Sequence, residues 1–85
     1  MLISYLIKNQ SKSFTIDQSQ YEQRLEIAVY EAYMLLLSLV LENEGYTREQ
    51  VLEHALYASD NEYQAMSYAL FELGIDEFSI MCAKV

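Results

Sequence analysis

The chain has 85 residues, a formal net charge of −8, and 53% hydrophobic residues. This length accommodates one domain, residues 1–85, and a domain so small can hide only part of its surface. The acidic balance argues against direct binding to nucleic acid or to an anionic membrane, because both repel a surface of the same sign.

The charge is unevenly distributed. Between Leu25 and Ala83 the chain is rich in acidic residues, and Arg48 is the only base. Such a surface favours a protein partner with a basic surface, whereas the alternative is that the charge only keeps a hydrophobic domain dispersed. The one cysteine, Cys82, excludes a disulfide within the chain. Without a recognisable secretory segment, we expect a cytoplasmic protein, in the host cell if a phage encodes it.

The N-terminal segment favours β-structure. Leu2 to Ile7 alternates loosely, residues 9–12 form a polar break, and Ser13 to Ile16 is again rich in strand-forming residues. This pattern predicts a hairpin, with an N-terminal helical turn as the alternative.

The stretch Leu25–Leu41 is the most apolar part of the sequence and predicts a long central helix. Asp17 or Ser19 can cap its start, and Gly45 can end it in the left-handed conformation. Its second half is apolar on nearly all sides, so it must be buried by neighbours or by another chain. The uncharged run is about half of what a membrane span needs.

Two shorter helices are expected after Gly45, over about residues 48–58 and 60–73. The first begins with a capping box, in which the hydroxyl of Thr47 and the side chain of Gln50 satisfy each other's backbone donors. Ser59 and Glu62 suggest a second capping box, and Gly74 follows the last helical residue.

The tail, residues 75–85, is compatible with a short helix or with a strand over Phe78–Ala83 that pairs with the N-terminal strand. The strand is favoured because two strands alone are barely stable. Together these elements predict a predominantly helical α+β domain. It would have a three-helix core around the long central helix and a small terminal β-sheet. The alternative is an all-α bundle.

No arrangement of residues suggests catalysis. His54 is the only histidine and has no nucleophile one helical turn away, and nothing near Cys82 except Lys84 would favour its thiolate. There is no convergent set of metal ligands and no glycine-rich phosphate loop. We therefore expect a non-enzymatic protein without a metal or another cofactor.

Residues 52–62, LEHALYASDNE, resemble a ubiquitin-interacting motif. In that family a single helix carries a Leu, an Ala three residues later, a second Leu, a Ser and then an acid. The resemblance covers 11 of the 85 residues and implies a helix that lies against the apolar patch of ubiquitin. The matching positions are Leu52, Ala55, Leu56, Ser59 and Glu62.

In size and charge the chain also resembles small phage proteins that inhibit CRISPR or restriction nucleases. That resemblance implies an inhibitor or DNA mimic whose carboxylates occupy a basic nucleic-acid channel. The alternative is a structural or regulatory protein: a helical homodimer or an adaptor, antitoxin-like or ubiquitin-binding-like. The expected partner-binding residues are Glu49, Glu53, Tyr57, Asp60, Glu62 and Tyr63.

The positions of the tyrosines separate these hypotheses. Tyrosines that are mostly buried belong to a core, whereas several exposed tyrosines beside Glu53 or Glu62 would form an interface, where aromatic anchors are favoured. The tyrosines in question are Tyr30, Tyr33, Tyr57, Tyr63 and Tyr68.

Overall fold

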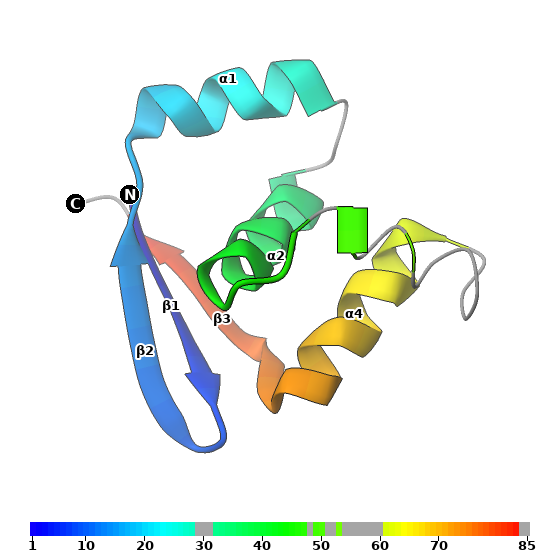
Figure 1. The fold of residues 1–85 in the computed structure, drawn as a ribbon. Coiled ribbons are helices and arrows are strands. Elements are labelled where there is room, and N and C mark those ends of the chain that lie inside the picture. The colour runs from blue at the N-terminus through cyan, green and yellow to red at the C-terminus, as the bar shows by residue number, and fades with distance from the viewer. Residues whose placement is uncertain (29–31, 48, 51–52, 54–60, 84–85) are drawn as a thin grey trace.

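The computed structural model describes residues 1–28, 32–47, 49, 50, 53 and 61–83. Over these residues the chain forms a small α+β fold in which helices pack beside one antiparallel sheet (Figure 1). In chain order the elements are β1 (Leu2–Ile7), β2 (Gln10–Thr15), α1 (Gln18–Ala28), α2 (Ala32–Asn43), α4 (Glu62–Leu73) and β3 (Ile75–Ala83).

The sheet has the strand order β2-β1-β3, so the N-terminal strand lies between the other two. The predicted hairpin is confirmed: β1 and β2 pair in continuous register from Leu2 opposite Thr15 to Ile7 opposite Gln10. Lys8 and Asn9 connect them, both with positive φ, which is the geometry that matches the twist of a two-residue hairpin. The strand predicted in the tail is also confirmed, and it begins earlier, at Ile75.

The predicted long central helix is wrong, and so is the three-helix core built around it. Helix α1 ends at Ala28 and α2 begins at Ala32. Arg24 and Glu42 are 18 residues apart in sequence, yet their side chains form an ion pair of 2.7 Å. In one straight helix they would be about 27 Å apart at 1.5 Å per residue. The all-α alternative is wrong as well, because three strands form the sheet.

Composition explains why the two helices occupy different positions. Helix α1 is mostly polar, whereas α2 has the sequence AYMLLLSLVLEN and buries most of its second half. The expectation that this half is covered on nearly all sides is confirmed. The polar segment and the apolar segment need different surroundings, which a single straight helix at the centre would not provide.

The core combines residues of the sheet with residues of α2 and α4. Tyr5 on β1 is buried, and its hydroxyl is hydrogen-bonded to the carboxylate of Glu44 and to the amide of Asn43, at the end of α2. This polar cluster attaches the C-terminal end of α2 to the hairpin. The buried apolar residues are Ile3, Tyr5, Leu35, Leu37, Leu39, Val40, Leu41, Ala65, Met66, Ala69, Leu70 and Ile75.

Most of the predicted helix ends are confirmed. Asp17 caps α1 by accepting a hydrogen bond from the Ser19 amide. After α2, Gly45 has a φ of 88°, and the Tyr46 amide reaches back to the Leu41 carbonyl, as in a Schellman motif. Gly74, with a φ of 79°, ends α4 in the same conformation.

The two predicted capping boxes differ in outcome. The amide of Thr47 donates to the Gln50 side chain over 2.8 Å, and the amide of Gln50 donates to the Thr47 hydroxyl over 3.2 Å, so the first box is confirmed. At the second, the helix begins at Glu62 instead of residue 60, and Asn61 is its cap. Asparagine is among the best N-cap residues, so it can take this role from a nearby serine. Ser59 and most of the predicted helix 48–58 lie outside the described residues.

Within the described ranges, no helix combines the length and the apolar character needed to cross a membrane.

Neighbouring residues of α4 provide a test of the core. Leu70 is fully buried, whereas Phe71 is 79% exposed. Leu70→Ala should lower the free energy of unfolding by about 2–5 kcal/mol, because it leaves a cavity. Phe71→Ala should change it by less than about 0.5 kcal/mol. Urea denaturation of both variants measures the difference, and equal losses would contradict the described packing of α4.

Candidate functional site

The pairing of β3 with β1 is interrupted by a bulge. Ser4 lies opposite Met81, but Leu6 lies opposite Asp76, so a short step along β1 faces a much longer segment of β3. Bulges of this kind bend a strand and redirect its side chains.

Two side chains close the bulge by hydrogen bonds. The hydroxyl of Ser79 accepts from the Leu6 amide over 2.8 Å and donates to the Asp76 carbonyl over 2.6 Å. The Asp76 carboxylate accepts from the Phe78 amide over 3.0 Å. The Ser79 hydroxyl therefore takes the place of a β3 carbonyl as the acceptor for the Leu6 amide. The Asp76 carboxylate stabilises the turn that contains Phe78.

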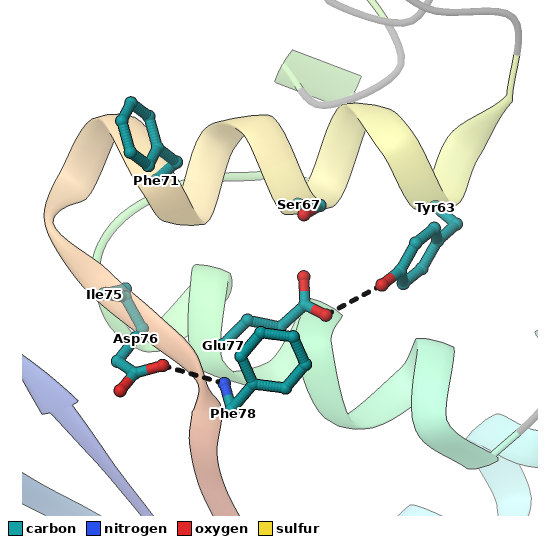
Figure 2. Close-up of a pocket in the computed structure, with 7 residues that line it drawn as sticks. All are labelled: Tyr63, Ser67, Phe71, Ile75, Asp76, Glu77 and Phe78. Atoms are coloured by element: carbon teal, nitrogen blue, oxygen red, sulfur yellow. Dashed lines mark hydrogen bonds between the residues drawn. The ribbon is translucent and has the colours of Figure 1, made fainter.

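The bulge sends two adjacent side chains in different directions. Phe78 is 92% exposed, whereas Glu77 is half-buried and points toward α4 (Figure 2). Between β3 and α4 lies an open pocket with a volume of about 330 Å³, which we call the Phe71–Phe78 groove. Its lining residues are Tyr63, Ser67, Phe71, Ile75, Asp76, Glu77 and Phe78.

Glu77 is held by tyrosine hydroxyls from two helices. Tyr33 on α2 and Tyr63 on α4 each donate to its Oε2 over 2.8 Å. Its Oε1 is enclosed, and no hydrogen bond of good geometry reaches it, although the Ser67 hydroxyl is close enough to act on the charge. Burial raises the pKa of Glu77, but the hydroxyls of Ser67, Tyr63 and Tyr33 together outweigh burial and lower this pKa. The carboxylate is therefore ionised at neutral pH.

The tyrosines respond in the opposite direction. Burial, followed by the hydrogen bond to Glu77, raises the pKa of Tyr33 to about 12. The hydrogen bond to Glu77 is the main cause of the raised pKa of Tyr63. Both phenols stay protonated at neutral pH and act as donors to the carboxylate, so this network holds a negative charge in place. A raised tyrosine pKa is unsuited to a base or nucleophile at neutral pH.

Of the predicted partner-binding residues that the structure describes, Tyr63 alone lines the groove. It is 40% exposed. Glu49 and Glu53 are exposed, but neither lines the groove. Glu62 is half-buried at the first turn of α4. Tyr57 and Asp60 lie outside the described residues, as do all positions of the ubiquitin-interacting resemblance except Glu62.

Sequence reasoning missed the other groove residues. Phe71 had a detectable signal, because it falls beside the apolar stripe of α4 and a large aromatic residue off that stripe is exposed. No signal in the sequence indicated Phe78 and Glu77, because the directions of their side chains depend on a bulge that strand alternation does not reveal.

The residues considered for catalysis are not brought together. Cys82 is exposed on β3 and His54 lies outside the described residues. In the part of the chain that the structure describes, no three His, Cys, Asp or Glu side chains are grouped as a metal site would require.

Comparison of the chain with protein-family models, with curated proteins and with solved structures gives no match.

The network predicts how Glu77 titrates. In the folded protein the midpoint of Glu77 should lie below its ordinary value of 4.5. A carboxyl group with a lowered folded-state pKa stabilises the fold above its unfolded pKa, and this stability is lost as pH falls through the lower folded-state value. Tyr63→Phe removes one donor and should raise the midpoint. Carbon-13 NMR of the side-chain carboxyl groups measures it.

The matched control for this titration is Tyr21→Phe. The Tyr21 hydroxyl donates to the Ala32 carbonyl and not to Glu77. This variant should therefore leave the midpoint of Glu77 unchanged. A Tyr63→Phe protein with the wild-type midpoint would show that the tyrosine bond does not control the charge of Glu77.

Proposed function

We propose that this protein is a non-enzymatic binding protein that docks onto a basic surface of a protein partner through the Phe71–Phe78 groove and its surroundings. In its specific form, the partner is a nucleic-acid-handling enzyme, and docking inhibits it, as an anti-CRISPR or anti-restriction protein would.

The exposure of the aromatic side chains carries this proposal. Three tyrosines are 40–47% exposed: Tyr33, Tyr63 and Tyr68. Two phenylalanines are more exposed still, Phe71 at 79% and Phe78 at 92%. Tyrosines beside carboxylates at a surface were the pattern expected of an interface rather than a core. The expected carboxylates were Glu53 or Glu62, whereas Tyr33 and Tyr63 donate to Glu77, and Tyr68 interacts with Glu72. Aromatic residues are favoured anchors at the centres of protein interfaces.

The charge distribution supports a basic partner. Lys12 is paired with Glu44 and Arg24 with Glu42, so these two bases already have acidic neighbours within the molecule. The remaining excess of acid is available to attract a positive surface and to speed encounter with it. Enzymes that bind nucleic acids carry such surfaces, because they neutralise phosphates with Lys and Arg.

The exposed apolar residues could also join two copies of this chain. Two copies that each carry a charge of −8 repel one another, which makes a second copy a poorer occupant than a basic protein. Sedimentation equilibrium separates the two: a dimer whose formation needs the groove would favour self-association instead.

Removal of the aromatic anchors tests the docking face. Phe71→Ala with Phe78→Ala should weaken partner binding at least about tenfold, because buried aromatic anchors often contribute 1.4 kcal/mol or more. The partner is first isolated from lysate of the protein's own host with tagged wild-type protein and identified by mass. Met81→Ala is the control, since Met81 is 67% exposed but does not line the groove. Full binding by the double variant would remove the groove from the proposal.

The contribution of the exposed carboxylates Glu49 and Glu53 is tested by charge reversal. Glu49→Lys with Glu53→Lys should weaken partner binding without unfolding the domain, because both side chains are exposed. The loss should shrink at high salt, which screens surface charges. Glu22→Lys with Glu26→Lys is the matched control, with the same spacing and exposure on α1. Equal effects of the two pairs would mean that only net charge matters, and unchanged affinity would exclude this face.

A further inference from the structure

We propose that the Phe71–Phe78 groove receives one arginine side chain of the partner protein. This inference rests on the proposed function and specifies the chemistry of its central contact.

Among the described residues that line the groove, two are acidic and none is a base. Asp76 and Glu77 are consecutive on β3, and both line the groove. Among the described residues, the ion pairs are made by Lys12 and Arg24, and neither of these reaches Asp76 or Glu77. A cationic side chain would therefore find charge complementarity there.

Glu77 is fixed in place but not fully satisfied. Tyr33 and Tyr63 both donate to Oε2, whereas Oε1 is enclosed and has no well-directed hydrogen bond, although the Ser67 hydroxyl lies near the carboxylate. A carboxylate can accept several hydrogen bonds, and an enclosed oxygen without a partner is unfavourable. A guanidinium group that enters beside Phe78 would supply donors, since the exposed Phe78 ring can move without disturbing the core.

The walls of the groove select arginine over lysine. The Phe78 ring is largely exposed and lies beside Glu77, whereas the Phe71 ring projects from the other side of α4, so Phe78 is the ring on which the guanidinium would stack (Figure 2). A planar guanidinium stacks on aromatic rings and presents several donors in a fork, whereas an ammonium group is a compact and strongly hydrated charge. The volume of about 330 Å³ lies at the lower end for ligand pockets and suits one long side chain.

The test uses a small probe in place of the partner. Nα-acetyl-arginine amide is titrated into nitrogen-15-labelled protein, and backbone amide shifts are followed by NMR. The shifts should concentrate at Ser67, Phe71 and residues 76–78. The uncharged analogue Nα-acetyl-citrulline amide has nearly the same shape and should bind at least about tenfold more weakly, because it cannot form charge-assisted hydrogen bonds.

Variants connect the shifts to individual side chains. Glu77→Gln should reduce the affinity for the arginine probe at least about tenfold, while Glu26→Gln, with the same change of charge on α1, should leave it unchanged. Because Glu77 also joins α2 to α4, Glu77→Gln could alter the fold. Phe78→Ala serves as a second variant, since the ring is 92% exposed, and it should weaken the probe about threefold.

The outcomes separate this inference from the function on which it rests. Equal binding of the two probes, or shifts spread over the acidic surface and unchanged by Phe78→Ala, would overturn the arginine site. If partner binding still required Phe71 and Phe78 in that case, the proposed docking face would stand alone. If the arginine probe bound as expected but partner binding did not require Phe71 and Phe78, the proposed docking face would fail. The groove would then bind arginine, but not an arginine of this partner.

Discussion

The pairing of β3 with β1 is the constraint on which the structure depends. It brings the C-terminal strand beside the N-terminal one and places β1 between two neighbours. Only Gly74 separates α4 from β3, so the position of β3 also fixes where the C-terminal end of α4 lies. The close approach of Lys8 to Gly74 leaves no room for a Cβ there, and the Lys8 amide donates to the Gly74 carbonyl over 2.8 Å. The hairpin turn and the end of α4 are thereby fixed together.

Local chemistry in the sequence predicted the ends of elements better than their arrangement. Gly45, Gly74 and the pair Thr47 and Gln50 have roles that depend only on nearby backbone groups, so their residue types were informative. The prediction of a long central helix failed because the stretch Leu25–Leu41 is mostly apolar and contains no proline or glycine that would mark a break. Periodicity describes which side of a helix is apolar, and it does not reveal that α1 and α2 are two helices instead of one.

The candidate site was less predictable than the fold because it depends on contacts between distant segments. Tyr63 was identified as a partner-binding residue, but its acidic neighbour in space is Glu77, 14 residues later. Tyr33 reaches the same carboxylate from α2, 44 residues away. Both hydrogen bonds require the bulge that turns Glu77 toward α4 and Phe78 toward solvent. No local pattern around residues 76–79 specifies that the register of β3 changes there.

The groove combines a carboxylate held by hydrogen bonds with exposed aromatic residues, and this combination suits recognition better than catalysis. The tyrosine hydroxyls keep Glu77 ionised and hold it in one position, while their own raised pKa values keep them protonated. A proton-transfer site would instead place a group with a pKa near the working pH beside the reacting atom. Here no proton needs to move for the network to act. A carboxylate that is already oriented costs a partner less ordering on binding, and the exposed phenylalanines add apolar area once water is excluded.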